Sequence, residues 1–364
     1  MRVLLIVTDR YSYGGTSRFL EQLLEIHERN GIDTALLVPS HLYDDSLISL
    51  AIKHKYKIFS KVNRNRQNTF PLLTPFFDFS FSWETVKSFR PNILVVSTAD
   101  PGRMSVAFYF PAPLLYILHT MPEKSFRLLP RLYMRLGSML NNLTIAVSRA
   151  AARSISINMG IPTDKISVVY NSCHLIQNKT KADSSIVLTV GHLVPYKNPH
   201  LWLKVAQQVI KSRFDVKFIW LGDGELLTSL REMVASLSLE ELVLLPGHVP
   251  DPSQWYERSQ IYFQPSLRES HGIAVLEAMA HGLPCVVADT GGLPESVVDN
   301  ETGFICSPED ATGFTDRILN LFTDASLRLR MGTAGRLRIE RCFSEAAQEQ
   351  KILALYDNLV KKTK

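Results

Sequence analysis

The chain has 364 residues, of which 46% are hydrophobic and 21% are charged. That length is too great for one typical hydrophobic core and suits two domains, and the composition is that of an ordinary soluble globular protein. The four cysteines are scattered and form no Cys-x-x-Cys pair, which argues against a zinc site or a disulfide framework and is compatible with a reducing cytosol.

The charge is distributed unevenly along the chain. Residues 1–180 contain 21 Lys and Arg against 12 Asp and Glu, a net +9, whereas residues 181–364 contain 19 against 23, a net −4. A basic first half favours an anionic partner, such as an anionic membrane surface or a phosphate-bearing acceptor. The chain has no recognised nucleic-acid-binding motif, so we expect no nucleic acid among its partners.

The chain opens with a predicted strand, Val3–Val7, because too few apolar residues precede the first polar ones for a signal peptide. The longest nearly apolar run, Ala107–Leu118, contains two prolines and is too short to span a bilayer. We therefore expect a cytoplasmic protein. After the strand, a turn-rich loop, Asp9–Ser17, leads to a helix predicted from about Arg18 to Asn30.

Two adjacent glycines, Gly14 and Gly15, lie at this junction between strand and helix. The Gly-x-Gly-x-x-Gly spacing of a dinucleotide fingerprint is missing. A glycine pair nevertheless permits a tight turn that brings the backbone close to a ligand. From the residues alone, an ordinary tight turn remains the alternative.

A basic segment, Lys53–Arg66, contains six Lys and Arg and no acidic residue, and it precedes the aromatic-rich segment Phe70–Trp83. A basic run beside exposed aromatic rings can rest on an anionic membrane, so peripheral membrane contact through Lys53–Arg66 is one hypothesis. The alternative is a solvated basic face with the aromatic rings packed inward.

Several further apolar runs predict strands of the first domain. They are Thr34–Pro39, Lys57–Ser60, Ile93–Ser97, Leu114–Leu118, Leu143–Val147 and Ile166–Tyr170. Residues 126–140 predict a helix with an arginine stripe in water, and Ser148 begins another helix.

His119 directly follows the strand at 114–118, and a His at the carboxyl end of a parallel strand points at the ligand cleft. Alone, such a His is more often a structural hydrogen-bonding residue.

The polar stretch Asn171–Ser185 is interpreted as a linker, and Ile186–Val190 then restarts the pattern of a first strand. Two similar α/β units are therefore predicted in tandem. The later apolar runs predict strands at Val216–Leu221, Leu242–Leu245, Ile261–Phe263 and Cys285–Ala288, and a long helix at Phe343–Lys361.

The most informative stretch is Pro265–Val298, where a loop and a helix, Ile273–Ala280, follow a buried strand. The backbone N–H groups of His271, Gly272 and Ile273 at the start of that helix, together with the helix dipole, would form an anion site suited to a diphosphate.

Two carboxylates, Glu269 and Glu277, accompany this anion site. They could accept hydrogen bonds from the hydroxyl groups of a sugar and of a ribose. From spacing alone, solvated positions for both carboxylates are equally compatible with the sequence.

The stretch Pro265–Val298 resembles the signature of retaining glycosyltransferases of family 4, the group 1 glycosyl transferases with the GT-B fold. In that family two Glu residues separated by seven positions mark the nucleotide-sugar site, and Glu269 and Glu277 have this spacing. The flanking runs Glu-Ala-Met-Ala-His-Gly-Leu-Pro and Asp-Thr-Gly-Gly-Leu-Pro-Glu also match. One small departure is His271, where an aromatic residue is usual.

The resemblance implies roles for residues elsewhere in the chain. Lys197 matches the lysine that binds the donor diphosphate and stabilises it as it leaves. His192 stands where the family has an arginine, and a neutral His supplies neither a fixed charge nor a forked donor geometry. Protonation beside a phosphate would let His192 serve, whereas otherwise the site is weakened or the enzyme is degenerate.

Three further positions carry implied roles. The Gly14–Gly15 pair would face the donor phosphates, and His119 would lie beside the transferred sugar at the reaction centre. Backbone groups near Val249 would line the base pocket. The catalytic group implied is thus His119, Lys197 and Glu269. The resemblance also implies that no metal or other cofactor is needed, and the absence of an Asp-x-Asp motif is compatible with this.

The expected fold is α/β of the GT-B type, with two Rossmann-like domains whose parallel sheets face a deep interdomain cleft. The expected boundaries are 1–171 for the acceptor domain, 172–342 for the nucleotide-sugar domain and 343–364 for a C-terminal helix that packs back on the first domain. The implied activity is retaining, metal-independent transfer of a sugar from a nucleoside-diphosphate sugar to a hydroxyl of a glycan or lipid-linked acceptor. The alternatives are a nucleotide-sugar epimerase of the same fold and a catalytically silent nucleotide-sugar-binding protein.

Overall fold

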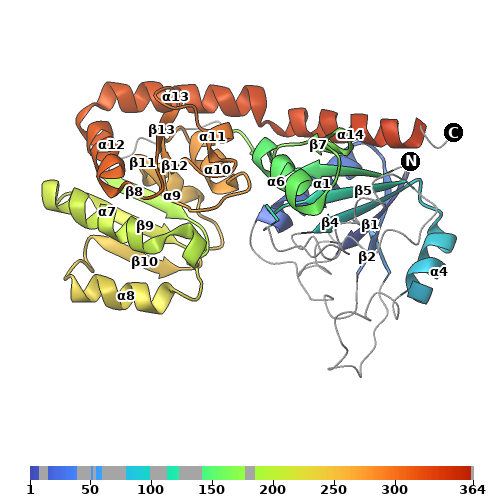
Figure 1. Cartoon of the computed structure of the whole chain (residues 1–364), viewed down its shortest axis with the longest axis horizontal. Helices are drawn as coiled ribbons and strands as arrows, with labels where there is room; N and C mark the ends of the chain where they lie inside the picture. The colour runs from blue at the N-terminus through green and yellow to red at the C-terminus, as the bar shows by residue number, and fades with distance from the viewer. Residues whose placement is uncertain are drawn as a thin grey trace. The chain divides into compact units, whose positions relative to one another are not determined.

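The computed structural model of the chain describes residues 1–7, 15–38, 51, 55–59, 79–98, 113–122, 142–176 and 185–361, with the backbone alone for 79–83. It divides into two compact units (Figure 1). Unit 1 comprises Met1–Tyr170 and Gln348–Lys364, and unit 2 comprises Asn171–Ala347.

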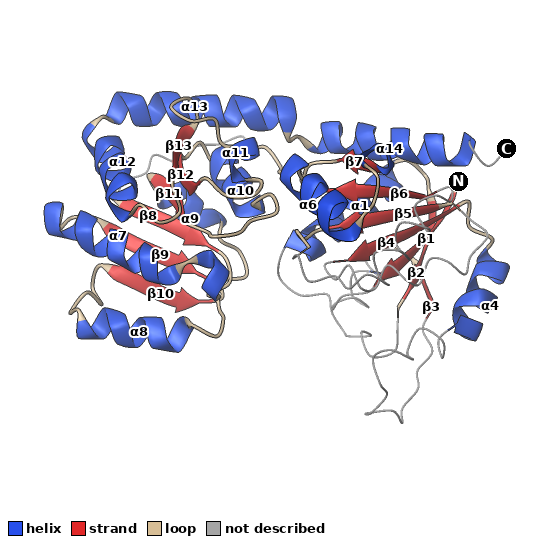
Figure 2. Cartoon of the chain, viewed as in Figure 1, coloured by secondary structure: helices blue, strands red, loops and turns tan. Residues whose placement is uncertain are grey.

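Unit 1 contains a parallel sheet with, in the part of the chain that is described, seven strands in the order β3-β2-β1-β4-β5-β6-β7 (Figure 2). The strands are β1 (Arg2–Val7), β2 (Asp33–Leu37), β3 (Lys57–Phe59), β4 (Ile93–Thr98), β5 (Leu114–Leu118), β6 (Asn142–Ala146) and β7 (Ile166–Val168). The helices in its described residues are α1 (Gly15–Arg29), α4 (Phe79–Phe89), α6 (Arg149–Met159) and α14 (Glu345–Lys361). The part of α14 from Gln348 onward belongs to unit 1.

Both faces of this sheet are buried, which explains why its strands are almost continuously apolar. Successive side chains of a strand point to opposite faces, so Val3 and Leu5 of β1 join one core cluster while Leu4 and Ile6 join the other. The first cluster also takes in side chains of α1 and α14, and the second takes in side chains of α6. The sheet is thus sandwiched between helices.

A buried histidine connects α1, β2 and α14 within unit 1. The Nδ1 atom of His27 lies 2.9 Å from Thr34 Oγ1, and its Nε2 atom lies 2.8 Å from Tyr356 Oη. Burial lowers the pKa of His27 to about 3, so the ring is neutral at pH 7. One hydrogen bond therefore joins His27 to α14 and the other joins it to β2, in addition to the apolar packing of α14 in unit 1.

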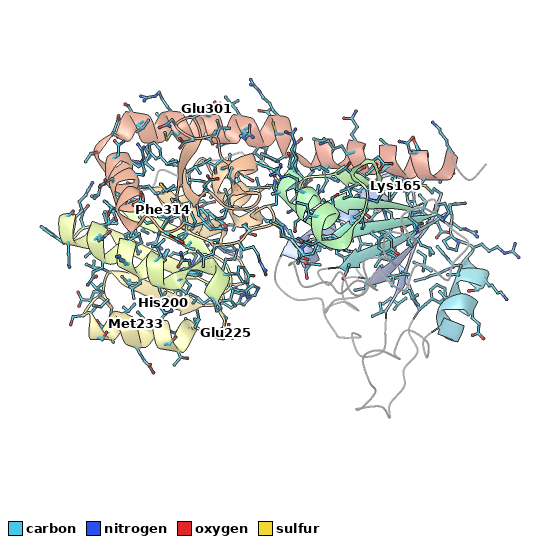
Figure 3. All side chains as sticks on the ribbon, in the orientation of Figure 1. Lys165, His200, Glu225, Met233, Glu301 and Phe314 are labelled. Atoms are coloured by element: carbon cyan, nitrogen blue, oxygen red, sulfur yellow. The ribbon has the colours of Figure 1, made fainter. Side chains whose placement is uncertain are left out.

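Unit 2 repeats the architecture with a parallel sheet in the order β10-β9-β8-β11-β12-β13. Its strands are β8 (Ile186–Val190), β9 (Lys217–Leu221), β10 (Val243–Gly247), β11 (Ile261–Gln264), β12 (Cys285–Ala288) and β13 (Gly303–Cys306). Its helices are α7 (Pro199–Ser212), α8 (Leu227–Ser236), α9 (Ser253–Arg258), α10 (Ile273–Ala280), α11 (Leu293–Ser296), α12 (Ala311–Thr323) and α13 (Ala325–Cys342). Phe314, labelled in Figure 3, is fully buried in this unit, and its ring centroid lies 5.2 Å from that of Phe263.

The α/β class and the two Rossmann-like units are as predicted, with small differences at element ends. Helix α1 begins at Gly15 rather than near Arg18, because the glycine is already helical. Strand β7 ends at Val168, two residues earlier than expected. The predicted helix at 126–140, Gly14 and most of the basic segment 53–66 lie outside the described residues.

The predicted linker begins at Asn171, where the two units divide. Its first residues, Asn171, Ser172 and Cys173, are buried. The reason is a tertiary contact, since the Cys173 N–H donates to the carbonyl of Phe343, 3.0 Å away, after the end of α13. Residues 177–184 of this stretch lie outside the described part. Among the described residues, no helix is long and apolar enough to cross a membrane.

Candidate active site

Three loops gather at the carboxyl edge of the sheet of unit 2. They follow the neighbouring strands β8, β11 and β12, which pair in parallel, so the loops at 191–197, 265–272 and 289–292 emerge side by side. This edge is where ligands bind in open parallel sheets.

Two hydrogen bonds join the second and third loops. The Gly292 N–H donates to the Glu269 carbonyl at 2.9 Å, and Thr290 Oγ1 donates to the Ser266 carbonyl at 2.7 Å. A Cβ atom at Gly292 would lie 2.3 Å from the Ser270 carbonyl oxygen, so only glycine fits this approach. The turn at 289–292 therefore holds the loop that carries Glu269 in place.

The start of α10 has the geometry of an anion site. Gly272 precedes the helix with a φ of 86°, in the left-handed region that glycine adopts without strain. Its carbonyl accepts the N–H groups of Val275 and Leu276. Within the described residues, the N–H groups of Gly272 and Ile273 have no such acceptor, so with the helix dipole they can receive a phosphate oxygen.

Lys197 and Glu269 form an ion pair, which the sequence did not predict. Lys197 ends a short 3-10 turn after β8, and Glu269 lies in the loop after β11. Their side chains are only 14% and 15% exposed, which excludes the solvated position that the sequence allowed for Glu269. This partly buried ion pair at the edge of the sheet couples the group expected to hold the diphosphate with the one expected to hold the sugar.

The turn that precedes Lys197 is built by close backbone packing. The Leu193 N–H donates to the Asp223 carbonyl at 2.9 Å, and a Cβ atom at Gly222 would lie 2.0 Å from the Gly191 carbonyl oxygen. His192 lies in this turn and is exposed. Val249 follows β10 and is half-buried, and its role at a base pocket remains a prediction.

Glu277 lies on α10, one turn from its start, and is half-buried. Its Oε2 atom accepts a hydrogen bond from Tyr256 Oη at 3.0 Å. Burial, and to a smaller extent the charge of Glu277, raise the pKa of Tyr256, so the phenol keeps its proton and donates it. Tyr256 thus orients Glu277, and nothing in the sequence pairs the two residues.

In unit 1, His119 follows β5 and its Nε2 atom lies 2.9 Å from Ser97 Oγ near the end of β4. Its ring meets Phe19 of α1 edge to face at 5.0 Å between ring centroids. Burial lowers the pKa of His119 to about 4, so the ring is neutral at pH 7. Gly15, the first residue of α1, is exposed. The same helix carries Phe19, whose ring contacts His119.

His271 is buried with its ring centroid 5.4 Å from that of Phe343. Burial lowers its pKa to about 3, so this histidine fills the position as an uncharged ring. The neutral His271 ring packs as an aromatic side chain would, so the loop keeps its packing although an aromatic residue is usual at this position. Among the described residues, no group of three or more His, Cys, Asp or Glu side chains is placed to hold a metal ion.

Two family models match adjacent parts of the chain. The model described as glycosyl transferases group 1 matches residues 174–338, and the model described as glycosyltransferase family 4 matches residues 13–175. Together they cover most of both units.

Individual proteins are also similar to this chain in sequence or in fold. The capsular polysaccharide biosynthesis glycosyltransferase CapM of Staphylococcus aureus is 28% identical over 205 residues, which cover 56% of this chain and 54% of that protein. An uncharacterized glycosyltransferase of Haemophilus influenzae is 29% identical over 324 residues, covering 86% and 91%. The crystal structure of Anabaena HepE in complex with UDP has a TM-score of 0.80 at 19% identity, covering 98% of this chain and all of that one, which shows a shared fold.

Proposed function

Because the chain belongs to glycosyltransferase family 4 and has the GT-B fold, we propose that it transfers a sugar from a nucleoside-diphosphate sugar to a hydroxyl group, with retention of configuration and without a metal ion. The acceptor is proposed to be a glycan or a lipid-linked intermediate. CapM acts in capsular polysaccharide biosynthesis, and HepE is crystallised with UDP, which supports this class of donor and pathway.

The observation that carries the proposal is the Lys197–Glu269 ion pair beside the start of α10. In the transfer, the bond between the anomeric carbon and the phosphate oxygen breaks as the bond to the acceptor oxygen forms. Lys197 and the N–H groups of Gly272 and Ile273 stabilise the negative charge that builds on the departing diphosphate. The acceptor proton leaves to the departing phosphate oxygen, so no separate general base is required.

The two acidic residues take different hydroxyl groups in this proposal. Glu269 accepts hydrogen bonds from the transferred sugar, next to the diphosphate that Lys197 holds. Glu277, fixed by Tyr256, accepts from the ribose of the nucleotide. In unit 1, Gly14, Gly15 and His119 are proposed to contact the donor phosphates and the transferred sugar.

The test is a thermal unfolding panel with UDP, GDP, ADP and their common sugars, each with and without EDTA. A ligand at a hundred times its dissociation constant adds about 2.7 kcal/mol to the free energy of unfolding. We expect the nucleotides of one base to raise the unfolding temperature, and EDTA should not change that rise. The corresponding sugar nucleotide should then support transfer in an acceptor screen. No response to any nucleotide would overturn the proposal, and binding without turnover would favour a silent binding protein.

Replacing His192 with arginine is expected to raise the transfer rate by about tenfold, equivalent to about 1.4 kcal/mol at the transition state. Arginine supplies a permanent charge and a forked donor for the diphosphate, which histidine lacks. Initial rates at saturating donor measure the change. His200→Arg is the matched control, since His200 is also exposed, lies on α7 of the same unit and is labelled in Figure 3. A fall in rate for His192→Arg would instead make the histidine itself a selected part of the site.

A further inference from the structure

Gln264 is a buried polar residue that no part of the proposed reaction uses. It is the last residue of β11 and only 2% exposed. Its side chain lies between Tyr262 and Glu269: Tyr262 Oη lies 2.9 Å from Gln264 Oε1, and Gln264 Nε2 lies 2.8 Å from Glu269 Oε2. Burying an amide at the end of a strand is costly unless both of its ends are bonded, which is the case here.

The direction of the amide is determined by its neighbours. Tyr262 Oη lies 3.4 Å from the Val190 N–H, which donates to it, and burial raises the pKa of Tyr262, so the phenol keeps its proton. The hydroxyl can donate that proton to Gln264 Oε1 at 2.9 Å or to the Val190 carbonyl at 3.3 Å. The carboxylate of Glu269 accepts hydrogen bonds, so the amide NH2 group must face it and the amide oxygen faces Tyr262. The chain of contacts from β8 through Tyr262 therefore presents a donor to Glu269.

Both donors to Glu269 act on the same oxygen atom. Lys197 Nζ and Gln264 Nε2 both bond Oε2. In the part of the chain that is described, no donor bonds Oε1. A carboxylate with one oxygen held by the protein and the other open is oriented to accept a hydrogen bond from a ligand hydroxyl.

We propose that Gln264 is a positioning residue that holds Oε2 of Glu269 while Lys197 turns to the diphosphate, and so keeps Oε1 directed at a hydroxyl of the donor sugar. This inference rests on the proposed function. The ammonium group of Lys197 has three N–H donors, and a bound diphosphate draws some of them away from Glu269. Gln264 is the other described donor on the carboxylate, and it stays in place. The amide is neutral, so it does not compete for the diphosphate.

The first test is Gln264→Met, which keeps the length of the side chain and removes both hydrogen bonds. We expect the transfer rate at saturating donor to fall by about tenfold or more, since small displacements of a positioned group have effects up to about a hundredfold. Affinity for the free nucleoside diphosphate should change less than threefold, because that ligand lacks the transferred sugar whose hydroxyl Glu269 would accept. The matched control is Gln208→Met, which removes the hydrogen bond that Thr315 Oγ1 donates to Gln208 Oε1 elsewhere in unit 2. Equal rates in Gln264→Met and Gln208→Met would overturn the proposal.

The second test is Gln264→Glu, which places two carboxyl groups within hydrogen-bonding distance. Like charges raise the upper pKa of such a pair. Below that pKa the new carboxyl is protonated and donates to Glu269 as the amide does, and above it the two charges repel. We expect the rate of the variant relative to the wild type to fall as pH rises between 5 and 9. A ratio that does not change with pH would contradict the positioning role.

The unfolding of Gln264→Glu separates this inference from the proposed function. The folded pair binds a proton more tightly than the unfolded chain, so the unfolding temperature of the variant relative to the wild type should also fall as pH rises. If the wild type neither binds nor transfers a sugar nucleotide, the proposed function fails. The pH dependence of the unfolding temperature of Gln264→Glu still reports a proton shared between positions 264 and 269. If this pH dependence is absent, the contact between the two side chains is wrong.

Discussion

Replacing Lys197 with alanine is expected to lower the transfer rate by about 10²- to 10³-fold, the usual cost of removing one charge-stabilising group from a transition state. Lys197 is the cation of the ion pair with Glu269 and is only 14% exposed. Its charge acts where water is largely excluded, and there it stabilises a departing diphosphate strongly. Initial rates with the sugar nucleotide found in the ligand panel measure the effect.

The control for Lys197→Ala is Lys204→Ala, which removes an exposed lysine from α7 in the same unit. It should retain the wild-type rate. Unfolding temperatures of both variants distinguish loss of chemistry from loss of folded protein, because removing Lys197 also leaves the charge of Glu269 without its partner. If Lys197→Ala transfers within twofold of the wild type, the diphosphate is held elsewhere and the proposed mechanism is wrong.

Acid should destabilise unit 1 through His27. The pKa of His27 is about 3 in the folded protein and 6.5 without burial, so the unfolded chain binds the proton more readily. The contribution of the neutral, buried His27 to the free energy of unfolding is therefore complete above pH 6.5 and is lost as pH falls towards 3. Within that window each such histidine lowers the free energy of unfolding by up to about 1.4 kcal/mol per pH unit.

The variant His27→Gln keeps a polar amide in the core but has no group that titrates in this range. It should be less stable than the wild type at pH 7, because its hydrogen bonds to Thr34 and Tyr356 are imperfect. The difference should shrink as pH falls to 4, measured by urea unfolding at several pH values. His200→Gln, on an exposed helix position, should leave the slope unchanged. Parallel pH profiles for wild type and His27→Gln would contradict the assignment.

The sequence predicted best where local signals coincide. Helix α10 and strand β12 begin and end at the predicted residues, because Gly272, Gly282 and Pro284 interrupt the apolar runs. The end of β7 and the start of α1 were predicted less well, because apolar or turn-like residues continue past the real boundary.

The contacts within the candidate site could not be predicted from the sequence. The resemblance named Glu269 and Lys197 separately, yet they are 72 positions apart and meet only because β8 and β11 are adjacent in the sheet. Gln264 has no signal of its own, since an amide at the end of an apolar run resembles the first residue of a loop. The burial of Cys173 was missed for the same reason, because its partner near Phe343 is distant in sequence.

The division of unit 1 into two segments has a consequence for biosynthesis. Ile352, Tyr356 and Leu359 complete the core cluster that begins at Val3, but all of unit 2 is translated between the two segments. At the usual pace of about 5–20 residues per second, translation of that insert occupies roughly 10–40 s. During this interval the nascent sheet has one face without its last helix, so chaperones that bind exposed apolar surface should engage the chain on the ribosome until α14 emerges.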